Sequence, residues 1–213
     1  MTTFLLIRHG ESQANLKEIF CGQSDYPLTD TGVLQAQCTA AFISKNYCVK
    51  HIYASDLSRA YATAQAIGEA TGVPVQKETR LREIYCGEWE EASFDEMLTR
   101  WPEVYPVWLN DIGNCRCPGG ESVKDVQKRV VALLDELAAR HADETVVLAS
   151  HGCVIRMLLC VLDGKPLDEM KHIPWPHNAS VTELMHENGA WRFGRKDENA
   201  HLGDLSTGLP DKV

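Results

Sequence analysis

Leu5-Leu6-Ile7-Arg8-His9-Gly10 decides the fold, because a short apolar run ends there in a His-Gly pair. Val147-Leu148-Ala149-Ser150-His151-Gly152 repeats this pattern, and a third apolar run occupies residues 51–54. Each run is bounded by polar or glycine residues and lies near a helical pattern, which is typical of buried strands in an α/β sheet. The predicted fold is a three-layer α/β/α sandwich with a mostly parallel central sheet. Its strands are expected at residues 4–7, 51–54 and 145–149.

Helical patterns lie beside these runs. We expect helices at residues 29–44, 58–70, 122–142 and 152–162. The longest carries its apolar residues at helical spacing, and the last is apolar enough to be buried. Residues 180–185 and 191–193 are expected to form a hairpin around Glu187-Asn188-Gly189. The tail at residues 199–213, which carries Gly, Pro and Asp, is expected to be loose.

Residues 84–121 form an aromatic and proline-rich insertion. Such an excursion between sheet elements shapes a lid or a pocket wall in many enzymes, and it also serves as a satellite core packed on the sheet. Both interpretations stay open at this point. The sequence otherwise shows no linker or repeat, so we expect one domain over residues 1–213 with a lid-like insertion at about 84–121.

Composition limits the classes of partner. The 213 residues carry a formal net charge of −9, with 44% apolar and 24% charged residues. An acidic surface repels nucleic acids and anionic membranes, so we expect neither as a partner. The apolar run near the start is too short for a signal peptide or a membrane span, which predicts a cytoplasmic protein. The eight cysteines are expected to be free thiols.

The two His-Gly pairs predict where the chemistry lies. In open α/β sheets, ligands bind beyond the carboxyl ends of the strands, so His9 and His151 should stand at one rim. Arg8, at the end of a buried strand, needs an anion as its partner. Arg59 follows the third strand and falls in the first turn of a helix, where a bound dianion would explain a cation. These residues together predict an anion site.

The chain resembles the histidine phosphatase superfamily, which is also called the phosphoglycerate-mutase-like family, and within it the phosphatase branch. The resemblance rests on an ordered set of motifs between residues 4 and about 185. They are Arg8-His9-Gly10-Glu11-Ser12, Pro27-Leu28-Thr29 with Gly32, Ser55-Asp56-Leu57-Ser58-Arg59-Ala60, Leu81-Arg82-Glu83, Gly87-Glu88-Trp89-Glu90, Gly119-Gly120-Glu121-Ser122, Ser150-His151-Gly152 and Asn178-Ala179-Ser180. Relatives carry a glycine where this chain has Glu91, which puts the substrate preference in doubt.

The resemblance implies a phosphoglycerate-mutase-like fold and a role for six residues. His9 would be the nucleophile that becomes phosphohistidine, and Glu83 would donate a proton to the leaving oxygen. Arg8, Arg59 and His151 would hold the phosphoryl oxygens, and Asn15 would also touch the phosphate. The implied activity is metal-independent hydrolysis of a small phosphorylated metabolite, with no cofactor. Candidate substrates are sugar phosphates, phosphoglycerates, α-ribazole phosphate and phosphorylated amino acids.

Elementary chemistry adds expectations about protonation. His9 must be neutral at its attacking nitrogen, with the other ring nitrogen donating to the backbone near Gly10 or to Glu11. His151 is expected to be protonated, so that it adds to the positive charge of the two arginines. Partial burial is expected to raise the pKa of Glu83 and keep it protonated for donation.

Two other functions stay open. A mutase of the same family would return the phosphoryl group to a second hydroxyl instead of to water. A silent module would bind a phosphorylated ligand without turnover. The remaining histidines, which are His51, His141, His172, His177, His186 and His201, are expected to be structural or exposed. No metal site is expected, since Cys115-Arg116-Cys117 is not a CxxC pair and no second pair accompanies it. The oligomeric state stays open and includes a homodimer.

Overall fold

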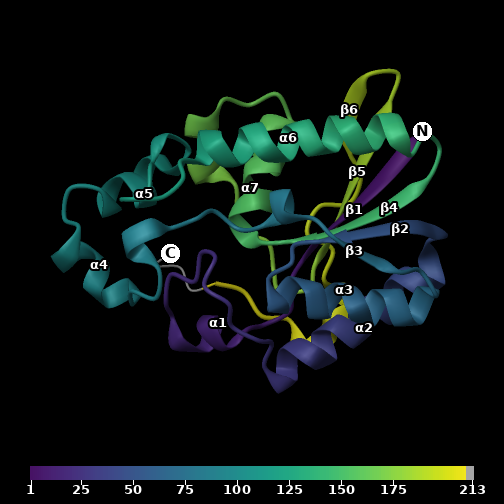
Figure 1. Cartoon of the computed structure of the whole chain (residues 1–213), viewed down its shortest axis with the longest axis horizontal. Helices are drawn as coiled ribbons and strands as arrows, with labels where there is room; N and C mark the ends of the chain where they lie inside the picture. Colours follow the sequence, from purple (N-terminus) through teal and green to yellow (C-terminus); the bar gives the residue numbers. More distant parts are fainter. Residues whose placement is uncertain (210–213) are drawn as a thin grey trace.

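A single six-stranded sheet organises the computed structural model, which describes residues 1–209. The strand order is β3-β2-β4-β1-β5-β6 (Figure 1). The strands are β1 (Thr2–Arg8), β2 (Val49–Ala54), β3 (Val75–Lys77), β4 (Thr145–Ser150), β5 (Val181–Glu187) and β6 (Ala190–Phe193). Strands β3, β2, β4 and β1 are mutually parallel, whereas β5 pairs antiparallel with β1 and β6 pairs antiparallel with β5. The predicted mostly parallel sheet is therefore confirmed.

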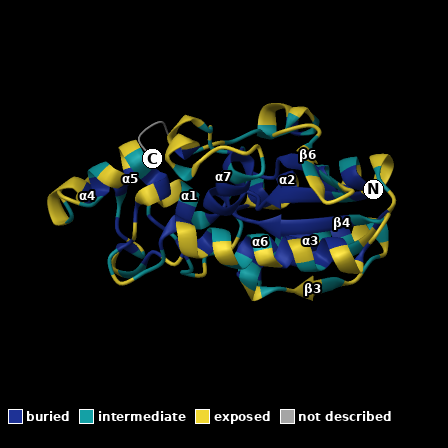
Figure 2. Cartoon of the chain, turned by 90° about the horizontal axis from the view of Figure 1, so that it is seen from above, coloured by how far each residue is buried: buried dark blue, intermediate teal, exposed yellow. Residues whose placement is uncertain are grey.

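Helices cover both faces of the sheet, which gives the three predicted layers. Helices α2 (Asp30–Asn46) and α3 (Ser58–Thr71) lie on one face, and α6 (Val123–Arg140) and α7 (Gly152–Val161) lie on the other (Figure 1). Successive residues of β1 serve opposite layers: Leu5 and Ile7 pack with α2 and α3, and Phe4 and Leu6 pack with α6 and α7. The central strands β1 and β4 are almost completely buried, whereas α3 and α6 alternate between buried and exposed residues (Figure 2).

Local signals place the helix ends. The Thr29 hydroxyl accepts the N–H of Gly32 at 2.9 Å and caps α2. Ser122 and Asp125 form a capping box at the start of α6, and Gly72, with a φ of 73°, ends α3 in the left-handed region. The four predicted helices thus have their predicted ends to within a few residues.

The insertion at residues 84–121 is more regular than its composition indicates. It contains the helices α4 (Phe94–Arg100) and α5 (Tyr105–Asp111) and the 3₁₀ turns η2 (Gly87–Trp89) and η3 (Ile112–Asn114). Trp89, Tyr105 and Trp108 are buried, and all three contact the ring of Phe20 edge-on at centroid distances between 5.4 and 6.1 Å. This packing is what a satellite core requires, and the lid motion stays a prediction.

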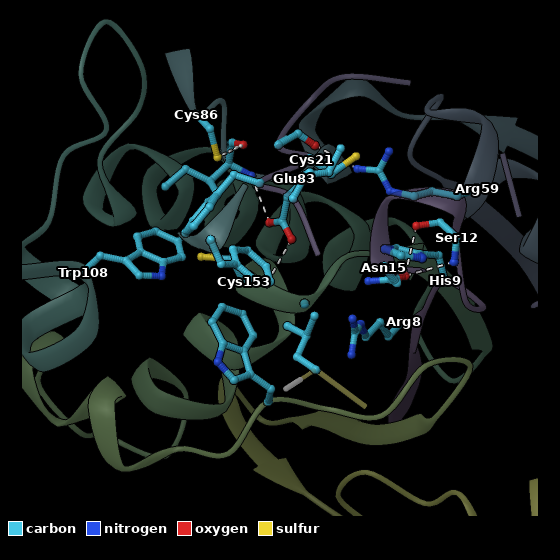
Figure 3. Close-up of a pocket in the computed structure, with 18 residues that line it drawn as sticks. Arg8, His9, Ser12, Asn15, Cys21, Arg59, Glu83, Cys86, Trp108 and Cys153 are labelled. Atoms are coloured by element: carbon cyan, nitrogen blue, oxygen red, sulfur yellow. Dashed lines mark hydrogen bonds between the residues drawn. The ribbon is translucent and has the colours of Figure 1, made fainter. Parts of the chain in front are cut away.

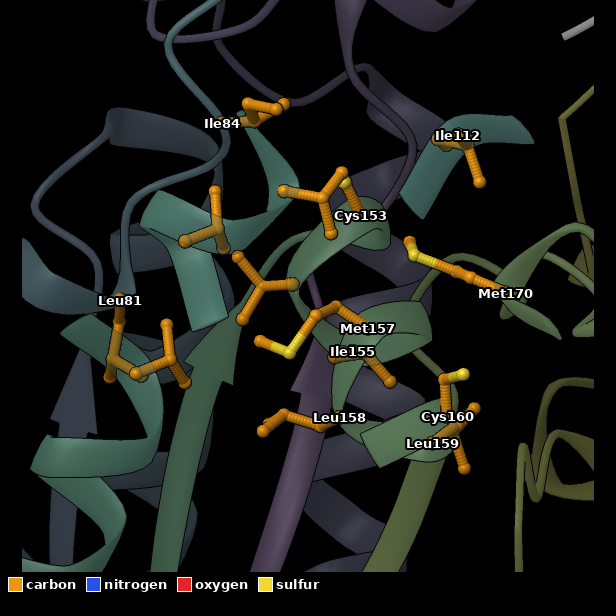
Figure 4. Packing of buried hydrophobic residues seen from close by; sticks show 14 of the residues in the cluster. Leu81, Ile84, Ile112, Cys153, Ile155, Met157, Leu158, Leu159, Cys160 and Met170 are labelled. Carbon is orange, nitrogen blue, oxygen red and sulfur yellow. The ribbon is translucent and has the colours of Figure 1, made fainter. Parts of the chain in front are cut away.

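The main core continues from α7 into this insertion. Cys153, Met157 and Leu158 of α7 lie among apolar side chains from the segments around Ile84 and Ile112 (Figure 4). The 3₁₀ turns η1 (Thr79–Leu81) and η4 (Leu167–His172) add Leu81 and Met170 to the same cluster. The carboxyl end of the sheet is therefore walled on one side by a continuous apolar layer.

The C-terminal segment is ordered, which corrects the prediction of a loose tail for residues 199–209. The 3₁₀ turn η5 (Ala200–Leu205) buries Leu202. Gln35 donates to the carbonyl of Leu205 at 2.7 Å, and Thr207 accepts the N–H of Asn178 at 2.9 Å. These long-range hydrogen bonds fix the segment, and a local reading of composition cannot see them. Residues 210–213 of the predicted tail lie outside the described residues.

The predicted hairpin is present as β5 and β6. Asn188 and Gly189 connect the two strands with φ values of 52° and 77°, which are the values that a tight hairpin turn requires. Within residues 1–209, no helix is long and apolar enough to cross a membrane.

Candidate active site

Two histidines meet at the carboxyl ends of the adjacent parallel strands β1 and β4. The ring centroids of His9 and His151 are 5.2 Å apart, and the backbone N–H of His9 donates to the carbonyl of Ser150 at 3.0 Å. The sheet register brings them together, because Arg8 pairs with Ser150 at the last position of both strands. The predicted common rim is therefore present.

The ring of His9 is held in one tautomer. Nδ1 lies 2.7 Å from the carbonyl oxygen of Gly10, and since a carbonyl only accepts, this nitrogen carries the hydrogen. Nε2 is then left with its lone pair. Burial, followed by the positive charges of Arg59 and Arg8, holds the pKa of His9 well below its ordinary value of 6.5. The expected neutral ring bonded to Gly10 is confirmed. Glu11 instead accepts a hydrogen bond from Thr29 at 2.7 Å.

The two arginines lie beside this ring and are almost completely buried. Arg8 donates to the carbonyl of Pro176, and burial lowers its pKa to about 10, so it stays charged at neutral pH. Arg59 is the second residue of α3 and donates to the carbonyls of Gly22 and Ser24 at 2.8 and 3.0 Å. The predicted cationic pair is therefore assembled at one place.

His151, the second histidine of the site, is completely buried. Burial, followed by the positive charge of Arg59, holds its pKa well below 6.5. The protonated His151 that is expected beside a bound phosphoryl group stays a prediction, because the charge of a dianion would oppose the effects of burial and of Arg59. Its Nε2 lies 2.8 Å from the hydroxyl of Ser55. The sequence motif alone indicates no role for that serine.

Glu83 follows the 3₁₀ turn η1, and its carboxylate contacts the first turn of α7. It lies between the cationic side of the pocket and its apolar side (Figure 3). Its carboxylate accepts the N–H of Ile84 at 2.9 Å and of Cys153 at 3.0 Å. Burial raises the pKa of Glu83 above its ordinary value, and these two N–H groups act in the opposite direction. Arg129 donates to the Glu83 carbonyl at 3.0 Å and so fixes the backbone.

Asn15 lies in the short helix α1 (Gln13–Lys17) and lines the same pocket. Its amide oxygen accepts from the backbone N–H and from the hydroxyl of Ser12, both at 2.9 Å. The oxygen is thus occupied, which leaves the NH₂ group as the end that suits an anion. All six predicted residues therefore lie at one site.

Buried polar atoms mark the centre of this site. Among the described residues, Arg8 Nε and His151 Nδ1 are both buried without a hydrogen-bond partner. Such orphaned atoms cost free energy in a folded protein and are rare. A phosphoryl oxygen would satisfy both, because each can donate a hydrogen.

The rest of the pocket is apolar. Its lining includes Ile19, Phe20, Ile84, Phe94, Trp108, Trp175 and Leu209. Trp108, Cys86 and Cys153 lie on the far side of Glu83 from His9 and Arg59 (Figure 3). The Trp108 and Trp175 rings stack at a centroid distance of 6.3 Å. The pocket is open to solvent and holds about 580 Å³ of empty space when its open mouth is included.

Glu90, which the sequence shows only as part of a family motif, supports the cationic side of the pocket. Its carboxylate accepts the backbone N–H groups of Gln23 and Ser24 at 2.8 and 2.6 Å. The loop held in this way supplies the carbonyls that orient Arg59. The next residue, Glu91, has a φ of 65°, a conformation that favours glycine. Glu91, which stands where relatives carry a glycine, therefore keeps the glycine-like conformation of this turn at some cost in backbone strain.

Comparison with known proteins identifies the family of the chain. The family model of the histidine phosphatase superfamily (branch 1) matches residues 4–199. Phosphoserine phosphatase 1 of Hydrogenobacter thermophilus is 35% identical over 208 residues, which is 96% of each protein. A probable phosphoglycerate mutase of Yersinia pestis is 31% identical over 191 residues, or 90% of this chain and 88% of the relative.

Solved structures lead to the same family. A mycobacterial glucosyl-3-phosphoglycerate phosphatase in complex with VO3 has a TM-score of 0.84 at 32% identity, covering 92% of this chain and 98% of its own. A mutant phosphoserine phosphatase from Entamoeba histolytica in complex with phosphoserine has a TM-score of 0.84 at 30% identity, covering 95% and 100%. The family match over nearly the whole described chain confirms the resemblance. This chain belongs to the histidine phosphatase superfamily, branch 1.

Proposed function

We propose that the protein is a hydrolase of small phosphomonoesters and that its phosphoryl group passes through His9. The observation that carries the proposal is the pair of buried, unpartnered atoms Arg8 Nε and His151 Nδ1 beside a neutral imidazole. A phosphoryl group supplies the acceptor oxygens that both atoms need, and its negative charge is matched by two buried arginines.

The first step transfers the phosphoryl group. The free lone pair of His9 Nε2 attacks phosphorus, a P–N bond forms and the P–O bond to the alcohol breaks. The protonated Glu83 gives its proton to the departing oxygen. Arg8 and Arg59 offset charge on the oxygens in flight. A bound dianion would also raise the pKa of His151, because it opposes the burial and the cations that lower it in the free protein.

The second step restores the enzyme. The Glu83 carboxylate takes a proton from water, whose oxygen attacks phosphorus while the P–N bond breaks. Inorganic phosphate leaves, Glu83 is protonated again and His9 recovers its lone pair. The N–H groups of Ile84 and Cys153 can donate to the Glu83 carboxyl group whether it is protonated or ionised. The same group can therefore serve as acid in the first step and as base in the second.

The pocket also favours one kind of alcohol. The described side chains beyond Glu83 are apolar and aromatic, and the cations of the pocket lie on the His9 side. A charged alcohol part, such as the ammonium and carboxylate of phosphoserine, would lose water there without charged partners. We therefore propose that the alcohol part of the preferred substrate is apolar or aromatic. The same asymmetry favours hydrolysis over the mutase reaction, whose phosphoglycerates carry additional negative charge.

Phosphate release with matched variants tests the reaction. Wild type is expected to release phosphate from benzyl phosphate, and vanadate is expected to inhibit. His9→Ala should lose at least about a thousandfold in kcat, whereas the exposed His172→Ala serves as the matched control and should retain full activity. A His9→Ala protein that is folded and active would refute the phosphohistidine route.

Substrate preference is tested separately. Benzyl phosphate and O-phosphoserine both release a primary alcohol. A difference in kcat/KM between them therefore reports contacts with the pocket rather than the type of leaving group. We expect kcat/KM for benzyl phosphate to be higher by about tenfold or more. A preference for phosphoserine would overturn the proposed alcohol class and leave the proposed reaction standing. If the mutase reaction were the true one, phosphoglycerate isomers would interconvert without release of phosphate.

A further inference from the structure

We propose that His51, His141 and Glu144 bind a divalent transition-metal ion at the end of the sheet opposite the active site. One ligand atom from each residue lies within 4.8 Å of the other two. His51 lies near the start of β2, and Glu144 immediately precedes β4. The carboxyl ends of these strands carry Ser55 and His151, so the two sites stand at opposite rims of one sheet.

The backbone positions the three side chains independently of any ligand. His141 is the C-cap of α6, where its N–H donates to Leu137 at 2.9 Å and its carbonyl accepts from the Thr2 hydroxyl at 3.0 Å. The Glu144 carbonyl accepts the N–H of Thr3 at 2.9 Å. The site is therefore built on the ends of a helix and two strands, which favours a fixed geometry.

One carboxylate oxygen already bridges both rings. Glu144 Oε2 lies 3.0 Å from His51 Nε2 and 3.1 Å from His141 Nδ1. A cation at this point would take the place of the two ring hydrogens. The ring centroids of His51 and His141 are 3.9 Å apart, so binding requires the rings to tilt apart, and the partly exposed His51 has room to do so.

Tyr53 provides the outer support that metal-bound histidines typically have. Its hydroxyl lies 2.9 Å from His141 Nε2, and it stands two residues after His51 on the same face of β2. A hydroxyl can accept as well as donate, so it can hold the ring when the hydrogen moves to Nε2 and Nδ1 turns its lone pair to the metal.

Ligand chemistry identifies the class of ion. Two imidazole nitrogens and one carboxylate oxygen suit Zn²⁺, Co²⁺, Ni²⁺ or Cu²⁺ rather than Mg²⁺ or Ca²⁺, which prefer oxygen. Three protein ligands leave further positions for water. The site is separate from the proposed phosphoryl transfer, which needs no ion at this rim.

Calorimetry on the EDTA-treated full chain tests the proposal, with Zn²⁺ as the probe and vanadate present to occupy the active site. We expect one Zn²⁺ per chain and a rise in Tm. Glu144→Gln and His51→Ala should each weaken binding by at least about tenfold, whereas His172→Ala should not. Co²⁺ should give the visible absorption of a nitrogen-ligated ion, and this absorption should be lost in the same two variants.

Two results would overturn the site. One is the absence of Zn²⁺ and Co²⁺ binding to the folded wild type. The other is unchanged affinity and absorption in both Glu144→Gln and His51→Ala, which would place the ion elsewhere. Both substitutions are at partly exposed side chains, so the folded state of each variant can be checked by its Tm before titration.

Discussion

Replacing Glu83 by glutamine should slow the hydrolysis of some phosphomonoesters far more than others. Glutamine keeps the size of the side chain and one acceptor oxygen, so one of the two hydrogen bonds, from Ile84 or Cys153, survives. What the variant cannot do is give a proton to the leaving oxygen. General acid catalysis contributes about 10²–10⁴ in rate, which corresponds to about 3–5 kcal/mol of transition-state stabilisation.

The leaving group of the substrate determines how far kcat/KM falls in Glu83→Gln. Benzyl alcohol departs poorly without a proton, so kcat/KM for benzyl phosphate should fall by about 10²–10⁴. p-Nitrophenolate is stable as an anion, so kcat/KM for p-nitrophenyl phosphate should fall by no more than about tenfold. The ratio kcat/KM reports the transfer to His9 alone for both substrates, because slow hydrolysis of the phosphohistidine affects only kcat.

The exposed Glu88→Gln is the matched control, and both of its rates should equal those of wild type. Vanadate affinity of Glu83→Gln should stay close to that of wild type, since the arginines and histidines around the anion are unchanged. Equal losses for the two substrates would refute the reasoning, because Glu83 would then act by shaping the pocket and not by donating a proton.

Three further outcomes follow from the structure. Ser55→Ala removes the hydroxyl that leaves His151 Nδ1 free to donate to an anion, and vanadate affinity, measured by inhibition, should fall by about 10–100-fold. His9 and His151 stay neutral when folded but take protons when unfolded, so stability is lost as pH falls below 6.5 towards their lowered pKa values. The raised pKa of Glu83 acts oppositely, because its stability contribution is lost as pH rises above 4.5. The fall in Tm from about pH 7 to about pH 5 should thus be smaller in His151→Ala and larger in Glu83→Gln than in wild type. Thr29→Ala removes the cap of α2 and should lower stability by about 1 kcal/mol in urea unfolding, with little change in vanadate affinity.

Short apolar strands and capped helices could be predicted because their signals are local. The run before Arg8 and the cap at Ser122 each contain the information that their element needs. The site could be predicted for a similar reason, because parallel strands that both end in His-Gly must bring those histidines to one rim. The family motifs then supplied Glu83 and Asn15, which no local pattern identifies.

What could not be predicted depends on contacts between distant parts of the chain. The three-residue strand β3 and the five-residue helix α1 are too short to show a period. The lowered pKa of His151 depends on its burial and on the charge of Arg59, which is distant in the sequence. The proximity of His51 and His141 depends on where α6 ends over β2, and nothing near either histidine in the sequence indicates it.

The two ends of the described chain differ in what they permit an experimenter to attach. Met1 lies at the end of the sheet away from the pocket (Figure 1), whereas Leu209 is one of the residues that line the pocket. A fusion junction made directly after Leu209 would start in the pocket lining and compete with the incoming substrate for space. Attachment at the amino end keeps a tag or a surface away from the pocket.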